Sequence, residues 1–179
     1  MRLFHFSDDP GIARFDPRPV LTPSLRAPGR DWLNGPLVWA IEEPRQAMYL
    51  FPRDCPRIVL WPTEATTNAD RERFWQGEAW RTIAYVEEAW LEAIAGATLY
   101  RYHLPTEAFE SLDDAGMWIS RAPVTPLAME VISDLPAALA EQAVALRALP
   151  SLAPLRDVWS TTLHASGIRL RNARDWPRG

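Results

Sequence analysis

The single cysteine and the arginines beside it are the first residues whose types could carry chemistry. Cys55 stands between Arg53 and Arg57, and nearby cations lower the pKa of a thiol and make it nucleophilic. The alternative is a small buried side chain that fills space in the core, which is the commoner role of a lone cysteine.

Two adjacent carboxylates, Asp113 and Asp114, form the second candidate group. Paired acids can stabilise a cationic transition state. However, adjacent aspartates just before a glycine, here Gly116, are also typical of a turn, because their side chains hydrogen-bond to the neighbouring main chain. Both interpretations stay open at this point.

Several other chemistries lack their signature. Every cationic residue among the 19 Lys and Arg is arginine, which excludes a Schiff-base, P-loop or general-base lysine. The three histidines, His5, His103 and His164, are far apart and show no metal-ligand spacing, so we expect no metal site. Gly-rich phosphate loops, paired cysteines and serine-hydrolase elbows are also missing.

The overall charge limits the partners. A net charge of −4 and a pI near 5.4 argue against general nucleic-acid binding, which needs clustered cations, although a local basic patch stays open. No apolar run approaches the roughly 20 residues that cross a bilayer. Residues 1–9 do not have the form of a signal peptide, and a lone cysteine forms no internal disulfide. We therefore expect a cytoplasmic protein.

The length and composition predict one α+β domain over residues 1–179. With 47% hydrophobic residues the chain can bury a sizeable core, which we place in residues 1–150, followed by a helix and an Arg-rich tail in 151–179. Alternating or compact apolar runs predict strands, and helical periodicity and caps predict helices. The expected strands are 2–6, 37–41, 57–61, 98–104, 117–120 and 124–132; the expected helices are 42–50, one opening at 68, 83–94, 135–149 and 154–166.

The segment 16–36 is rich in Pro, Gly and Arg and shows little periodicity. A loop of this length in a compact domain is usually either functional or poorly ordered.

Four short motifs resemble those of the ADP-ribosyltransferase superfamily. They are Leu3-Phe4-His5-Phe6-Ser7, Val38-Trp39-Ala40 followed by Ala47-Met48-Tyr49, Tyr100-Arg101-Tyr102, and Trp118-Ile119-Ser120-Arg121-Ala122-Pro123-Val124. The last two are similar to the closing strands of the small rifampin ADP-ribosyltransferases. The resemblance implies a split, mostly antiparallel sheet with peripheral helices.

The same resemblance implies an NAD site. In it His5 and Ser7 would orient the ribose, and Trp39 and Tyr49 would hold nicotinamide. The pyrophosphate would meet an arginine, whose planar fork suits phosphate oxygens. The candidates for that arginine are Arg14, Arg18, Arg53 and Arg57.

At one catalytic position this chain departs from the pattern of that superfamily. Many members carry a carboxylate near the start of the last motif, where this chain has Gly116, Met117 and Trp118. Asp113 or Asp114 would supply it from just upstream. The resemblance implies a small nucleotide ligand and identifies no acceptor.

The whole chain, from Met1 to about Ala173, also resembles a bacterial family of uncharacterised proteins. The shared stretches are the start, Met1 to Ser7, and the segment Phe51 to Arg57. That family has no established activity to carry over.

Three functions follow as hypotheses. The first is an NAD-dependent transferase or NAD glycohydrolase. The second is a catalytically silent protein that binds a nucleotide or another ligand. The third is an interaction protein that uses Trp75, Trp80 and Trp90 as anchors.

Overall fold

The computed structural model describes residues 1–177, and the chain divides into two compact units. The first unit comprises Met1–Gln46 and Leu99–Val131, and the second comprises Ala47–Thr98 and Ile132–Gly179. Each unit has its own sheet, so the two are described separately.

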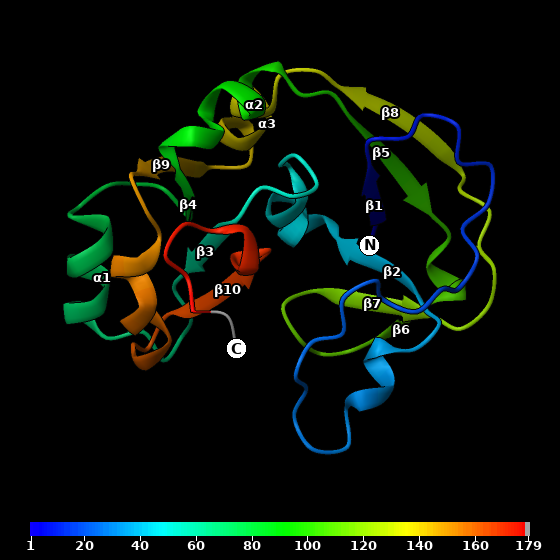
Figure 1. The fold of residues 1–179 in the computed structure, drawn as a ribbon, viewed down its shortest axis with the longest axis horizontal. Helices are drawn as coiled ribbons and strands as arrows, with labels where there is room; N and C mark the ends of the chain where they lie inside the picture. The colour runs from blue at the N-terminus through cyan, green and yellow to red at the C-terminus, as the bar shows by residue number, and fades with distance from the viewer. Residues whose placement is uncertain (178–179) are drawn as a thin grey trace. The chain divides into compact units, whose positions relative to one another are not determined.

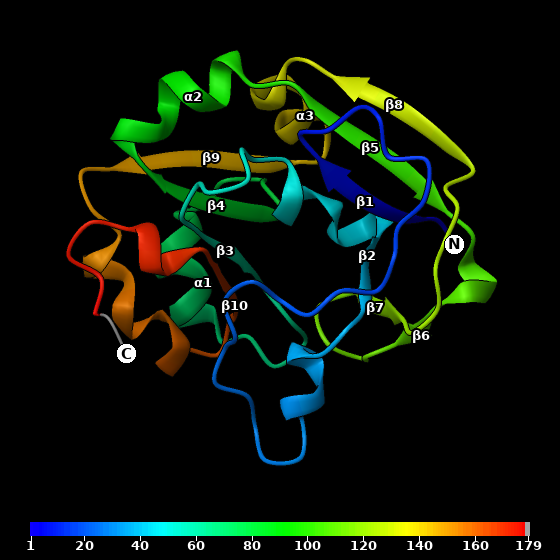
Figure 2. The same ribbon diagram turned by 45° about the vertical axis from the view of Figure 1, so that its right-hand side comes forward.

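A six-stranded sheet with the order β6-β7-β2-β1-β5-β8 forms the first unit (Figure 1). The pairs β1–β2, β1–β5, β2–β7 and β6–β7 are all antiparallel. The strands are β1 (Leu3–Ser7), β2 (Val38–Glu42), β5 (Leu99–Leu104), β6 (Glu110–Ser111), β7 (Met117–Ser120) and β8 (Ala128–Ile132). Figure 2 shows β8 lying outside β5 at one edge of this sheet.

The first unit packs a different apolar cluster on each face of its sheet. Leu3 and Tyr102 belong to a cluster covered by Phe15, whose main chain forms a bridge with Val124. Ile119 belongs to the second cluster. Residues 16–36 include the 3₁₀ helix η1 (Asp31–Asn34), and short 3₁₀ helices η2 (Glu43–Tyr49) and η4 (Thr106–Ala108) connect strands.

The second unit contains a four-stranded sheet with the order β10-β3-β4-β9. Its strands are β3 (Arg57–Trp61), β4 (Thr82–Glu87), β9 (Val144–Leu149) and β10 (His164–Ile168). The β4–β9 pair is parallel and the other two pairs are antiparallel. The helices are α1 (Asn68–Trp75), α2 (Leu91–Gly96), α3 (Leu135–Glu141) and the 3₁₀ helices η3 (Glu88–Trp90), η5 (Ala153–Ser160) and η6 (Leu170–Asn172).

The α+β class and the mostly antiparallel strand pairing are confirmed. Expected strands 2–6, 37–41, 57–61, 98–104 and 117–120 all occur within a residue of their predicted bounds. Asp134 caps α3 as a helix N-cap should, since its side chain accepts a hydrogen bond from the Ala137 N–H. The helix expected to open at 68 does so, and its N-cap is Thr67, whose side chain accepts a hydrogen bond from the Asp70 N–H.

Three predicted helices are wrong over part of their length. Residues 83–94 begin as strand β4 before η3 and α2, residues 135–149 end as β9, and residues 154–166 end in β10. The apolar runs in these segments fit a buried strand as well as a helix, and pairing in the four-stranded sheet decides between the two. The strand predicted over 124–132 starts only at Ala128.

Candidate functional site

In the first unit, the His5 side chain supplies a hydrogen bond to β2 where the main-chain pairing of β1 with β2 has ended. Strands β1 and β2 pair only at Leu3 with Glu42 and at Phe4 with Ile41. The Glu42 N–H points to the β7 side, where it donates to the Gly116 carbonyl, and alternation along the strand turns the Trp39 carbonyl toward β1. There the His5 Nδ1 donates to that carbonyl over 2.8 Å.

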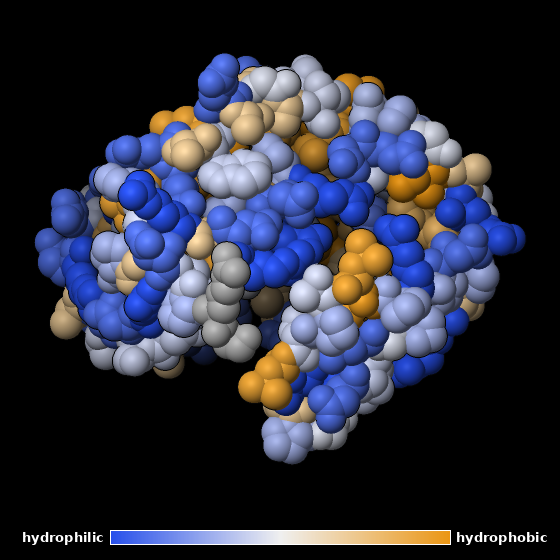
Figure 3. All heavy atoms as spheres, in the orientation of Figure 1, coloured by the Kyte–Doolittle hydropathy of each residue, from blue (hydrophilic) through white to orange (hydrophobic). Residues whose placement is uncertain are grey.

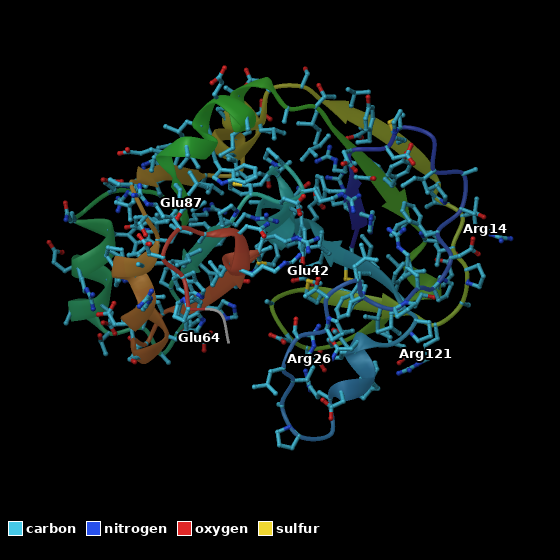
Figure 4. The ribbon with its side chains drawn as sticks, in the orientation of Figure 1. Arg14, Arg26, Glu42, Glu64, Glu87 and Arg121 are labelled. Carbon is cyan, nitrogen blue, oxygen red and sulfur yellow. The ribbon has the colours of Figure 1, made fainter. Side chains whose placement is uncertain are left out.

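The side chains of His5 and Trp39 lie on opposite faces of the six-stranded sheet. His5 pairs with Tyr102 across β5 and packs on the Phe15 ring at a centroid distance of 4.7 Å. Trp39 packs with the cluster around Ile119 instead. The Arg26 guanidinium (labelled in Figure 4) lies 5.9 Å from its ring. The indole Nε1 of Trp39 is buried and meets no hydrogen-bond acceptor among residues 1–177.

The remaining first-unit candidates are held by local contacts. The buried Ser7 hydroxyl accepts a hydrogen bond from the Asp9 N–H over 3.1 Å. Arg18 is exposed, and its main chain bridges to that of Leu37. Arg14 forms an exposed ion pair with Asp16.

Asp113 and Asp114 lie in the turn that joins β6 to β7. The Asp113 carboxylate accepts a hydrogen bond from the Ser111 hydroxyl at 3.0 Å, and its main chain has φ 52°. Asp114 is exposed, 4.0 Å from the Arg30 guanidinium. These contacts agree with the turn interpretation of this pair.

In the second unit, Arg57 carries a buried positive charge. It is 3% exposed at the start of β3, and it donates from Nε to the Met48 carbonyl at 2.7 Å and from Nη1 to the Cys55 carbonyl at 2.9 Å. The rings of Phe51 and Tyr49 lie 5.0 and 5.8 Å from its guanidinium. Burial is the main reason that its pKa falls to about 10, so it stays charged at neutral pH.

A second arginine, Arg169, lies close enough to Arg57 to lower its pKa further. Arg57 pairs with Ile168 across the β3–β10 ladder, so the next residue emerges beside it. Arg169 has φ 57°, a left-handed conformation that is costly for a residue with a Cβ. Its Nε donates to the Arg53 carbonyl at 3.1 Å.

We call Arg57 and Arg169 the arginine pair. Among the ion pairs formed within residues 1–177, none includes either member. The groups that shift the pKa of Arg57 after burial are Tyr49, Cys55 and Arg169, and no carboxylate is among them. A buried charge is normally paired, so the arginine pair is a candidate for binding an anion.

Cys55 does not have the environment of a nucleophile. Its side chain is fully buried, and burial raises the pKa of the thiol to about 12 despite the nearby Arg57. A protonated, inaccessible thiol reacts slowly because the thiolate is the reactive form. The role of a space-filling core residue therefore fits Cys55.

The structure places three residues that the sequence assigned to the nucleotide site in the second unit, Tyr49, Arg53 and Arg57, and the other seven in the first. Arg169 was missed, since its only signal was membership of an Arg-rich tail. Arg169 lies beside Arg57 because β10 pairs with β3, and no local sequence pattern predicts that pairing.

The proposed tryptophan anchors differ in exposure. Trp75 is buried, with its Nε1 donating to the Trp80 carbonyl at 2.7 Å, whereas Trp80 is exposed and Trp90 half-buried. Trp75 therefore cannot serve as a surface anchor. In the described part of the chain, no three His, Cys, Asp or Glu side chains gather as a metal site would need. The described helices include none with the length and apolarity of a membrane span.

A family of unknown function, DUF6886, matches residues 4–173, and the chain belongs to it. The extent agrees with the resemblance to an uncharacterised family from Met1 to about Ala173. No curated protein matches the chain. No solved structure matches it either, and the resemblance to ADP-ribosyltransferases finds no support in these comparisons.

Proposed function

We propose that this member of the DUF6886 family binds a phosphate-bearing nucleotide at the arginine pair, with NAD as the first ligand to test. The observation that carries the proposal is the buried charge of Arg57, whose hydrogen bonds within residues 1–177 go to two main-chain carbonyls and to no carboxylate.

The chemistry of the neighbours fits such a ligand. A guanidinium is a planar fork of N–H donors that matches phosphate oxygens, and Arg57 keeps N–H groups beyond those given to Met48 and Cys55. The half-buried Tyr49 ring beside it offers an apolar face to a planar base or nicotinamide. A free phosphate would use the arginines alone, whereas a nucleotide would use the ring as well.

The proposal is limited to binding. A transfer reaction would need a carboxylate at the ribose, and the role that the sequence gives to Asp113 and Asp114 of the first unit is tested separately. Replacing both with asparagine should leave nucleotide binding unchanged, and a nicotinamide-release assay of the wild type and this variant tests for chemistry.

The first experiment is a titration of the purified full chain with NAD, ADP and pyrophosphate. Calorimetry and thermal shift are its two readouts. A ligand that binds only the native state raises the melting temperature in a dose-dependent way. The test variant is Arg169→Asn, because asparagine tolerates a positive φ and removes the guanidinium. The matched control is Arg171→Asn, an exposed arginine two residues further along.

We expect Arg169→Asn to weaken NAD and ADP binding by at least about tenfold, since a hydrogen bond to a charged group contributes about 1.5–3 kcal/mol. Arg171→Asn should bind as the wild type does. A Tyr49→Ala variant should lose affinity for NAD but keep its affinity for pyrophosphate.

Two results would reject the proposal. One is the absence of any heat or melting shift at millimolar NAD, ADP and pyrophosphate. The other is equal affinity in the Arg169 and Arg171 variants. The same titration on His5→Asn tests the residues that the sequence assigned to the ribose.

A further inference from the structure

The segment 17–30 of the first unit, which we call the leucine loop, presents two apolar side chains to solvent. Leu21 is 97% exposed and Leu25 is 103% exposed. The charged residues of the loop are Arg18, Arg26 and Arg30, and it contains no acidic residue, while Asp16 and Asp31 flank it. Arg30 lies 4.0 Å from Asp114, so Arg18 and Arg26 are the loop's cations outside the ion pairs among residues 1–177.

Hydrogen bonds hold the loop in the conformation that exposes these leucines. Asn34 clasps the loop: its Oδ1 accepts from the Ser24 N–H at 3.1 Å and its Nδ2 donates to the Ser24 carbonyl at 3.0 Å. The Asn34 carbonyl also accepts from the Val20 N–H at 3.2 Å. The main chain on both sides of Leu21 is thereby held, and the two leucines point away from the unit.

Figure 3 shows hydrophobic side chains standing among hydrophilic ones over the region where Figure 1 draws the loop that leads to η1. Trp32, on η1 itself, is also exposed, and the Arg121 guanidinium lies 4.6 Å from its ring. Leucine, tryptophan and arginine therefore occur together on this side of the first unit.

We propose that the leucine loop docks the protein on an anionic lipid bilayer. Leu21 and Leu25 enter the apolar boundary of the bilayer, and the exposed Arg18 contacts the headgroup phosphates and carboxylates, with Arg26 beside it on the same loop. Trp32 suits the interface because its ring is apolar and its N–H is polar.

The charge of the loop favours a bilayer over a second copy of the chain. A bilayer offers an apolar interior beneath a negative surface without requiring a matching groove. A second copy that presented its own leucine loop would repel it through like charges, and one that presented an acidic surface would also need an apolar recess for both leucines. This inference is independent of the nucleotide proposal, because it involves neither Arg57 nor Arg169.

The test is co-sedimentation of the full chain with vesicles of phosphatidylcholine alone and of phosphatidylcholine mixed with phosphatidylserine. We expect binding to the mixed vesicles only, and weakening with added salt because exposed charges are screened. The double variant Leu21→Ser/Leu25→Ser should bind at least about tenfold more weakly, as two fully buried leucines are lost. Leu127→Ser is the control, since Leu127 is 72% exposed in the first unit but lies outside the loop.

Three results would overturn the proposal: no sedimentation with either vesicle, equal sedimentation with both, or wild-type binding by the double leucine variant. Size-exclusion chromatography without vesicles completes the test. A dimer that the double variant abolishes would assign the loop to self-association instead. Because both leucines are exposed, the variant should keep the wild-type melting temperature, which shows that a loss of binding is not a loss of fold.

Discussion

Removing the imidazole of His5 should destabilise the protein, because the ring contacts the Trp39 carbonyl and the Phe15 ring in the first unit. In His5→Ala the Trp39 carbonyl loses the donor 2.8 Å away, at a place where the β1–β2 ladder has already ended. An unsatisfied buried carbonyl costs about 1–3 kcal/mol. The lost ring contact with Phe15, at 4.7 Å between centroids, adds about 0.5–1.5 kcal/mol.

Because His5 is only half-buried, we expect the low end of these ranges, a loss of about 1.5–2 kcal/mol in the free energy of unfolding. For a chain of this size that corresponds to a fall of about 3–8 °C in melting temperature. The assay is urea unfolding followed by tryptophan fluorescence, with thermal unfolding as the second measurement.

His5→Asn separates the hydrogen bond from the ring. The Asn Nδ2 stands close to the position of the histidine Nδ1, so it can still donate to Trp39 while the contact with Phe15 is lost. We therefore expect it to lose about half as much stability as His5→Ala. Equal losses in the two variants, or no loss in either, would refute the assignment of His5 to the open ladder.

Three further predictions concern other residues. Cys55 should not react with a thiol reagent at pH 8 in the native protein and should react once per chain in denaturant, since burial raises its pKa to about 12. Gly116→Ala should cost about 1–3 kcal/mol in urea unfolding, because φ is +73° and the new Cβ would lie 2.6 Å from the Glu42 Cγ. Hydrogen bonding to Arg101 is the first cause of the lowered pKa of Glu130, so this pair stabilises the fold above the ordinary carboxyl pKa. That stability should be lost as the pH falls from about 4.3 through the lower folded pKa, and Glu130→Gln should flatten the acid limb of a stability profile.

Strands with a compact or alternating apolar pattern were predictable from the sequence. The β3 run from Arg57 to Trp61 has its predicted bounds, because five residues flanked by prolines are too short for a helix and rich in β-branched and aromatic side chains. The cap at Asp134 was predictable for a local reason too, since its carboxylate needs only the N–H three residues on.

The segments that contain both a helix and a strand could not be predicted from local sequence. Residues 135–149 are Ala-rich throughout, and helix propensity alone favours one helix across them. The chain instead turns at Ala143, which has φ 55°, and Val144–Leu149 joins β4 as a parallel strand. The backbone partners that β4 offers are distant in sequence, so no local pattern contains them.

The candidate site divides in the same way. The sequence by itself determined its residue types: arginine as the only cation besides histidine, one cysteine, and Tyr49 near Arg53 and Arg57. Tertiary structure decided that the charge of Arg57 is buried, and it brought Arg169 next to Arg57 by pairing β10 with β3. The physical reason is that burial and pairing depend on contacts between residues more than 100 positions apart, whereas composition and turn chemistry are local.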